Sequence, residues 1–296
     1  MKRLHVYKFL FSRMTGAGFA VLVLFFSAGC ASRSDKYGIQ PFGAVGTKAD
    51  VYVFASVSGN EPLLKTVLTA FVPEKTAAQY LKRTSALYIG VEYGSAPSVT
   101  LASAGSYPVN MSGVLFSKKD GWEKRRFAGM KNIAYYHSQA ADITLPSKHC
   151  AFALLGDKDR NTAVFLQRVS NPEQPVFPPR FQTLAETGGK GEIGLYARSG
   201  SAVAAQLFGM EDIELPVRSI ELYLKNTGSS YHYSAVFEAV NARAASVLRM
   251  LLGAVLAGTF SIQETSVFVE NADISEAELV ELLRGISLLK GDTRKL

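Results

Sequence analysis

The sequence predicts an α+β protein, with mixed, largely antiparallel sheets packed with amphipathic helices. Three observations support this fold class. Segments with alternating apolar side chains recur between residues 50 and 273, which is typical of half-buried strands. Other segments repeat apolar residues every three or four positions, as helices packed on a sheet do. Finally, the order of elements in residues 50–169 returns in residues 191–296, which indicates an internal duplication of a β-α-β-β-α unit.

Residues 1–29 are expected to be a signal peptide and not part of the fold. Residues 17–26 form an apolar stretch, and the small residues Ser27, Ala28 and Gly29 that follow it suit a signal peptidase. A basic segment precedes the stretch, with Lys2, Arg3, Lys8 and Arg13. The apolar stretch has only about half of the roughly 20 residues that a membrane-spanning helix needs, so we do not expect an uncleaved anchor.

Cys30 directly follows these small residues, and residues 27–30 resemble a bacterial lipobox, the signal for acylation of a cysteine. Ser27 stands where that box usually has leucine, and relaxed boxes of this kind are known from spirochaete lipoproteins. The resemblance implies that Cys30 is lipidated, and Ala31 after it favours the outer membrane. An ordinary secretory signal with an incidental cysteine is the alternative.

The charge of the chain gives no reason to expect nucleic-acid binding. The formal net charge is +7, from 32 Lys+Arg and 25 Asp+Glu. Four basic residues and no acidic ones leave with the signal peptide, so the mature chain has 28 basic against 25 acidic residues, or about +3. A nucleic-acid site would need a basic face with aromatic readers. If Cys30 is acylated, Cys150 has no disulfide partner, and its place in an apparent strand predicts a buried thiol.

Residues 30–49 are rich in glycine and polar side chains and are expected to form a flexible tether to a first α/β unit, residues 50–169. In that unit Asn60 is placed to cap a helix that Pro73 ends. The apolar face of this helix holds Leu63, Leu64, Val67, Leu68 and Phe71. Strands are expected at 49–59, 85–93, 98–105, 122–127, 132–139, 149–157 and 162–170, and short helices at 74–83 and 107–117.

Residues 170–190 are expected to connect this unit to a second α/β unit, residues 191–296. The connection begins with SNPEQPVFPPR, which holds four of the 11 prolines, and it continues into a glycine-rich stretch. In the second unit, strands are expected at 191–200, 218–228, 230–240 and 265–273, with a helix at 201–209.

The proposed duplication aligns the first strands of the two units, 50–59 with 191–200, and their second strands, 84–94 with 218–228. The elements between these strands are helical in both units. Because the identity between the halves is low, a chance similarity stays open.

The last helix is expected to begin at Ser275. Glu278 follows three residues later, which is the spacing of a capping box. Leucine and isoleucine residues from Leu279 to Ile286 share one face of this helix.

The helix expected at 241–258, NARAASVLRMLLGAVLAG, has an apolar face that covers half of its circumference or more. It is too short and too charged to span a bilayer. One interpretation is a central helix packed on a sheet with its arginines at the rim. The other is a helix that offers its apolar face to acyl chains, in a cavity or at the membrane interface. On the second interpretation the candidate lipid-binding residues are Val247, Leu248, Leu251, Leu252, Val255 and Leu256.

A second candidate membrane contact lies in residues 117–129, where basic side chains surround aromatic ones. Such a combination suits an anionic interface, at about 1 kcal/mol per contacting charge. The candidate residues are Lys118, Lys119, Trp122, Lys124, Arg125 and Arg126. The alternative is a solvated hairpin turn at Asp120 and Gly121, with Trp122 in the core.

Sequence motifs of the common enzyme classes are absent, which favours a protein without catalytic activity. The chain has no GxSxG elbow, no HExxH pair and no GxxxxGK[ST] loop. His137, His149 and His232 are scattered among apparent strands, so we expect no metal site and no cofactor.

The relaxed lipobox, the polar segment after it, the α/β body and the apolar amphipathic helices together resemble treponemal outer membrane-associated lipoproteins. The resemblance implies a periplasm-facing lipoprotein, anchored in the outer membrane by acylated Cys30, that binds lipid or inserts amphipathic helices into the inner leaflet. Its partner would be membrane lipid, met at the interface or in an apolar cavity. The alternative is a lipoprotein that assembles with a protein of the cell envelope and has no lipid ligand.

Overall fold

The computed structural model describes residues 41–69, 74–93, 98–112, 116–127, 133–139, 141–156, 158–207 and 214–285. The signal peptide and Cys30 lie outside the described residues. All described elements belong to one compact unit, Tyr37–Leu296, and this body contains two hydrophobic cores.

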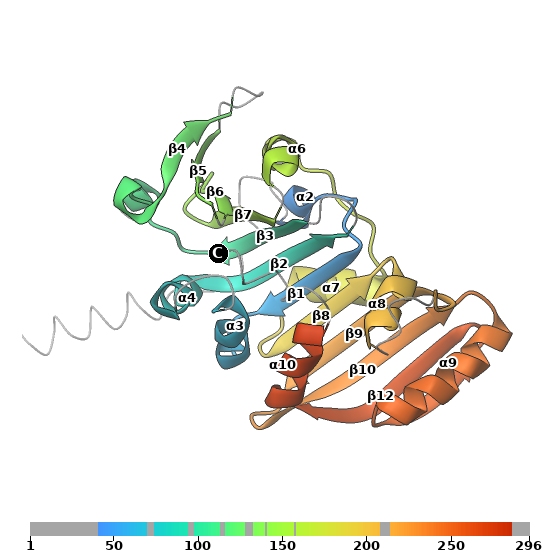
Figure 1. Ribbon diagram of the computed structural model, residues 1–296. Coiled ribbons are helices and arrows are strands. Elements are labelled where there is room, and N and C mark those ends of the chain that lie inside the picture. The colour runs from blue at the N-terminus through green and yellow to red at the C-terminus, as the bar shows by residue number, and fades with distance from the viewer. Residues whose placement is uncertain are drawn as a thin grey trace, which may run out of the picture. The chain divides into compact units, whose positions relative to one another are not determined.

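The body is built on one twelve-stranded sheet, and the pairings between its described strands are antiparallel (Figure 1). One half of the sheet runs outward from β1 (Val51–Ser56) through β2 (Thr84–Glu92), β3 (Ser98–Gly105), β7 (Cys150–Gly156), β6 (Ala141–Thr144) and β5 (Ala134–His137) to the edge strand β4 (Glu123–Arg126). The other half runs from β8 (Glu192–Ala197) through β9 (Val217–Asn226), β10 (Ser230–Ala239) and β12 (Ser266–Ser275) to the edge strand β11 (Thr259–Gln263). The predicted α+β class is confirmed.

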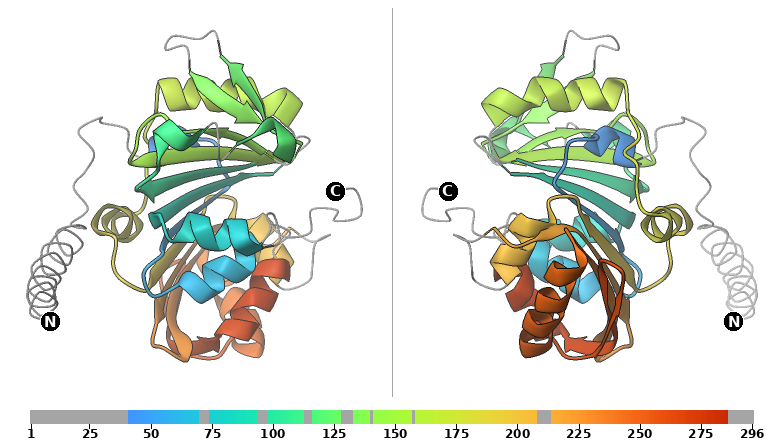
Figure 2. Two further views of the ribbon diagram at one scale, coloured as in Figure 1. Left: turned by 90° about the vertical axis from the view of Figure 1, so that its left-hand side faces the viewer. Right: turned by 90° about the vertical axis from the view of Figure 1, so that its right-hand side faces the viewer.

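Helices cover both faces of this sheet. Successive residues of a strand point to opposite sides, so one strand can contribute side chains to both layers. In β1, Val51 and Ala55 belong to one core and Tyr52 and Phe54 to the other. The first core also takes side chains of α3 (Glu61–Leu68), α4 (Glu74–Leu81), α8 (Gly200–Leu207), α9 (Ala242–Val255) and α10 (Glu276–Gly285). The second takes those of α2 (Pro41–Val45), α6 (Lys158–Ser170) and α7 (Pro179–Thr187). Figure 2 shows these layers from two sides.

The two expected units are joined within one sheet, since β1 and β8 pair directly. The pairing register repeats between them. In the alignment of the two halves, Glu192 corresponds to Val51 and Lys225 corresponds to Val91. Val51 of β1 pairs with Val91 of β2, and Glu192 of β8 pairs with Lys225 of β9. This agreement between alignment and register supports an internal duplication.

The segment expected to be part of a flexible tether is partly folded. Within residues 41–49, helix α2 packs between β2, β3 and α6, and Val45 is 0% exposed. Glycine makes this close approach possible: a Cβ atom at Gly90 of β2 would lie only 2.2 Å from Val45 Cγ1. The tether is therefore shorter at its C-terminal end than the composition indicated.

Three further expectations are corrected. Residues 162–170, expected to be a strand, form most of α6, because the buried Phe165, Leu166 and Val169 recur at helical spacing. The connection at 170–190 contains helix α7, which contacts β8. Asn60 does not cap α3 through its side chain, and its Nδ2 donates instead to the carbonyl oxygen of Ser56 at 2.9 Å.

Of the remaining elements, some were predicted from the sequence and two short strands were not. The capping box at the start of α10 is confirmed, since the hydroxyl of Ser275 donates to Glu278 Oε2 at 2.6 Å and the N–H of Glu278 donates back to Ser275 Oγ at 3.2 Å. Residues 107–117 contain a short 3-10 helix, η1 (Val109–Met111). The short strands β6 and β11 were not expected from the sequence.

Candidate membrane-contact surfaces and a polar pocket

Helix α9 begins where Asn241 caps it: the Asn241 side chain accepts a hydrogen bond from the N–H of Ala244 at 2.9 Å. One face of the helix packs on β10, β11 and β12. Ala244, Ala245, Leu248 and Leu252 form this face and are all buried. Two small residues in the first turn let the helix approach the sheet closely, and the two leucines fill the space further along.

Several apolar side chains in and beside α9 remain in solvent. Val247 is 45% exposed, Met250 69% and Val255 57%. Val240, just before the helix, and Ile262 on the neighbouring strand β11 are 40% and 37% exposed. We call these five residues the α9 surface. Only two other large hydrophobic residues in the described part of the chain, Val164 and Val176, are similarly exposed. Exposed apolar side chains are therefore concentrated at this end of the sheet.

The six candidate lipid-binding residues are divided between the core and the surface. Leu248 and Leu252 are buried at 2% and 0%, so packing on the sheet occupies them. Leu251 and Leu256 are half-buried, and Val247 and Val255 are exposed. The inward side chains of α9 and α3 belong to one core, in which Leu63 is 1% exposed.

The sequence analysis missed Met250, Val240 and Ile262. On a helical wheel Met250 falls on the arc with the arginines, opposite the apolar face, and that position alone predicts its exposure. No local pattern marks the exposure of Val240, which lies just before α9, or of Ile262, whose position beside α9 depends on the order of strands in the sheet.

The basic segment forms a projecting hairpin at the other end of the sheet, as the strand order requires (Figure 1). Lys118 and Lys119 lie in the 3-10 helix η2 (Lys118–Asp120), and both side chains are exposed. All four residues of β4 are exposed, including Lys124, Arg125 and Arg126. Arg125 donates two hydrogen bonds to Glu123 Oε2, at 3.0 and 2.7 Å. This contact lowers the pKa of Glu123.

Aromatic side chains support this hairpin from within. Trp122 is half-buried, with its ring edge-on to Phe116 at a centroid distance of 5.0 Å. Phe116 in turn lies 4.7 Å from the ring of Tyr136, and Lys124 Nζ is 5.9 Å from the Tyr136 centroid. Trp122 is therefore part of a small local cluster, and the exposed groups of the hairpin are mainly its cations.

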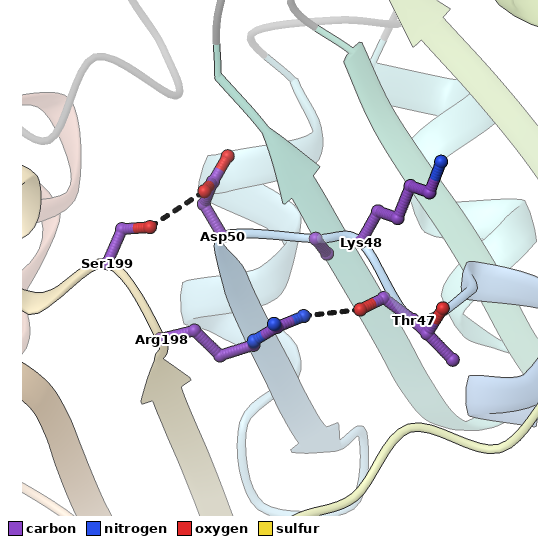
Figure 3. A pocket seen from close by; sticks show the side chains of 6 residues that line it. Thr47, Lys48, Asp50, Arg198 and Ser199 are labelled. Atoms are coloured by element: carbon purple, nitrogen blue, oxygen red, sulfur yellow. Dashed lines mark hydrogen bonds between the residues drawn. The ribbon is translucent and has the colours of Figure 1, made fainter.

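A polar pocket of about 310 Å³ lies where β1 begins and β8 ends (Figure 3). Its walls are Thr47, Lys48, Ala49 and Asp50 from one segment and Arg198 and Ser199 from the other. Ser199 Oγ donates to Asp50 Oδ1 at 2.8 Å, and the Arg198 guanidinium donates to the carbonyl oxygen of Thr47. The backbone N–H of Arg198 also donates to the Asp50 carbonyl at 2.8 Å. These bonds fix two segments that lie far apart in the sequence.

The electrostatics of this pocket are dominated by two cations. Asp50 uses both carboxylate oxygens internally, since Oδ2 accepts from the N–H of Tyr93 at 2.8 Å. Neither Lys48 nor Arg198 forms an ion pair within 4.0 Å among the residues that the structure describes. Burial raises the pKa of Tyr52, which lies beneath this region, and the Arg198 guanidinium opposes part of that rise.

Comparison of the sequence with known proteins shows which family the chain belongs to. The profile of the family described as outer membrane-associated lipoprotein TP0453 matches residues 36–280, most of the chain. The chain belongs to the TP0453 family of outer membrane-associated lipoproteins. The outer membrane protein TP0453 of Treponema pallidum (strain Nichols) is 27% identical over 257 residues, which cover 86% of this chain and 88% of the relative.

Crystal structures of TP0453 have the same fold. Crystal form III superposes with a TM-score of 0.73 at 28% identity, and the match covers 86% of this chain and 100% of the other. Crystal form I gives a TM-score of 0.72 at 27% identity, covering 85% and 99%. The resemblance to spirochaete outer membrane-associated lipoproteins is confirmed, and with it the predicted association with the outer membrane.

Membership of the TP0453 family does not test the predicted acylation of Cys30 or the predicted lack of catalytic activity. The profile begins at residue 36, so it says nothing about the acylation of Cys30, which also lies outside the described residues. The family description names an association with the membrane and no reaction. Within the described ranges, no helix is both long and apolar enough to cross a membrane.

A buried carboxylate of this family member pairs locally. His137 Nδ1 hydrogen-bonds to Asp142 Oδ1 at 2.6 Å, and Thr162 of α6 donates to Asp142 Oδ2. Asp142 is 0% exposed, so this contact fastens α6 to the buried end of β6. No cluster of three or more metal-ligating side chains occurs in the described ranges.

Proposed function

We propose that this lipoprotein, anchored by acylated Cys30, contacts acyl chains of the inner leaflet of the outer membrane through the α9 surface. The observation that carries the proposal is the exposed apolar side chains of α9 and their neighbours, with the exposed Arg243 and Arg249 on the same helix. Helix α9 contains no acidic residue, so nothing in the helix itself repels an anionic bilayer. An apolar face with arginines at its edge is the pattern of helices that lie in a membrane interface.

The magnitude expected for this contact is modest. Full burial of a valine or methionine side chain contributes about 1.5–3 kcal/mol. Scaled by the exposed fractions of Val247, Met250 and Val255, insertion of these three side chains contributes about 3–5 kcal/mol. Arg243 and Arg249 add about 1 kcal/mol each beside anionic headgroups. These energies suit a contact that the lipid anchor holds near the membrane, where binding becomes an intramolecular event.

The short segment between Cys30 and α2 keeps the body close to the membrane. Ten residues, 31–40, separate Cys30 from the start of α2, and an extended chain of that length reaches about 35 Å at most. The folding of residues 41–49 onto the body keeps the linker to this length. A body held so close to the bilayer meets lipid continually.

The basic hairpin is a second proposed contact, with anionic headgroups. Lys118, Lys119, Lys124 and Arg126 reach solvent and make no ion pair among the described residues. Because β4 and β11 are opposite edges of the twelve-stranded sheet, the hairpin and the α9 surface are separate contacts.

Assembly with an envelope protein is the alternative proposal. The outer edges of β4 and β11 have no strand partner in the described sheet, and a free edge can accept a strand of another chain. The charged side chains of β4 are also a common protection of an edge against such pairing.

Vesicle flotation of a chain that begins at Ala31 tests the lipid proposal. Val247→Glu should abolish most of the flotation, while Val164→Glu should leave it unchanged. The two valines are matched, because each is on a helix and 45% exposed, but Val164 lies on α6, which packs in the other core. Equal flotation of both variants and the unaltered chain would remove the proposal. Crosslinking of a strand partner to β4 or β11, with no flotation at all, would favour the alternative.

A further inference from the structure

We propose that the pocket between Thr47–Asp50 and Arg198–Ser199 binds a phosphate-bearing anion. This site is separate from the α9 surface and does not depend on the function proposed above. Its two segments are fixed to each other by the Ser199–Asp50 and Arg198–Thr47 hydrogen bonds (Figure 3). The shape of the pocket is therefore set before any ligand enters.

The charge of the pocket favours an anion. Lys48 and Arg198 contribute two positive charges, and Asp50 contributes one negative charge. Both oxygens of Asp50 already accept hydrogen bonds, from Ser199 and from the N–H of Tyr93, so the carboxylate holds the walls together.

Arg198 keeps donors for a ligand. Its guanidinium donates to the Thr47 carbonyl and also interacts with the hydroxyl of Tyr52. An arginine side chain carries several N–H groups in a planar fork, and those not used on these two oxygens can donate to phosphate oxygens. The side chain is exposed, so an anion can reach it from solvent.

The backbone of residues 47 and 48 adds further donors. The N–H groups of Thr47 and Lys48 donate to no acceptor among the described residues. Successive backbone N–H groups in a turn conformation make a concave site that favours anions. In Figure 3 the Lys48 side chain extends away from Asp50 and Ser199. This side chain is exposed and makes no ion pair within the described ranges, so its four-carbon stem can turn its ammonium toward a bound anion.

The position of the pocket connects it to the anchor. Thr47 closely follows α2, and the chain before α2 leads within ten residues to Cys30. A phosphate group reaches such a site either as part of a lipid headgroup or as a small soluble anion. Both sources share the chemistry that Lys48 and Arg198 recognise.

Inorganic phosphate is the first probe, added to the chain that begins at Ala31. We expect phosphate, but not chloride at equal ionic strength, to raise the melting temperature, and calorimetry to give a dissociation constant. Lys48→Glu should weaken phosphate binding at least tenfold, and Arg198→Gln should do the same. Lys190→Glu is the matched control, because it makes the same charge change as Lys48→Glu but lies just before β8, at the opposite end of that strand from Arg198. Equal phosphate binding in all four proteins, or none in the unaltered chain, would overturn the proposal.

Vesicles then distinguish the two sources of phosphate. If Lys48→Glu reduces flotation on phosphatidylglycerol but not on phosphatidylcholine, the ligand is a lipid headgroup. If phosphate binds and vesicle flotation is unchanged, the ligand is a small soluble anion, and the proposal stands in that form. Val247→Glu should leave phosphate binding intact, so failure of the α9 proposal and failure of this one give different results.

Discussion

Replacement of Gly90 by alanine tests how tightly α2 is docked on the sheet. A Cβ atom at this position would lie 2.2 Å from Val45 Cγ1 and 3.1 Å from Ala49 Cβ. Carbon atoms in contact are about 3.5–4.0 Å apart, so the Val45 side chain would have to move by roughly 1.5 Å. Val45 is 0% exposed and has no free space to enter without a shift of α2.

The expected loss of stability follows from two opposing effects. Overpacking of a core costs about 1–3 kcal/mol. The removal of a glycine from the interior of a strand returns about 0.5–1 kcal/mol, because the unfolded chain loses conformational freedom. We expect Gly90→Ala to lower the free energy of unfolding by about 1–2 kcal/mol. For a chain of this size that corresponds to a decrease of roughly 3–6 °C in Tm.

Urea unfolding of a double-mutant cycle with Val45→Ala measures the contact itself. Val45→Ala removes the atom that a Cβ at Gly90 would meet, so the two substitutions together should cost less than the sum of each alone, with a coupling of about 1 kcal/mol. Limited proteolysis should cleave Gly90→Ala faster within residues 37–50. An unchanged unfolding midpoint for Gly90→Ala, or strictly additive costs in the cycle, would refute the reasoning.

Two other substitutions test local contacts. Asp142→Ala should lower the free energy of unfolding by about 2–4 kcal/mol, because the His137 and Thr162 side chains lose a buried acceptor. Asp273→Ala is the control, since it removes the exposed pair with His232. In the same urea titration it should cost less than about 1 kcal/mol. Equal costs would contradict this account of burial. At α10, hydrogen bonds from Ser275 lower the pKa of Glu278, so their contribution is present above the unfolded pKa and is lost as the pH falls through the folded one. The Tm difference between the unaltered chain and Ser275→Ala should therefore shrink from about pH 6 to about pH 3, and a constant difference would contradict the assignment.

Local patterns predicted the elements that depend on local physics. Alternating apolar residues marked β1 and β8, because successive residues of a strand point to opposite faces whatever its partner is. The Ser275–Glu278 spacing predicted the start of α10, because a capping box is closed within one turn. The strand predicted at residues 162–170 was wrong because a continuous apolar run suits a strand or a helix. Only the packing of these residues against the sheet decides between the two. The flexible tether predicted at residues 41–49 was wrong because glycine and proline indicate a flexible chain unless a distant residue gives the segment a place to pack. Here that residue is Gly90.

The sequence by itself determined the class of fold, the repeated strands and the presence of an apolar helix at 241–258, whereas the association with the outer membrane came from the resemblance to a known family. The first three follow from periodicity and from short signals that act within a few residues. Only the tertiary structure decided which side chains of that helix remain in solvent, because Leu248 and Leu252 are buried by strands that pair far along the chain. Pairing of β1 with β8 likewise brings Thr47 and Asp50 to Arg198 and Ser199. Such contacts are set by strand order and register, which no local pattern of residues contains.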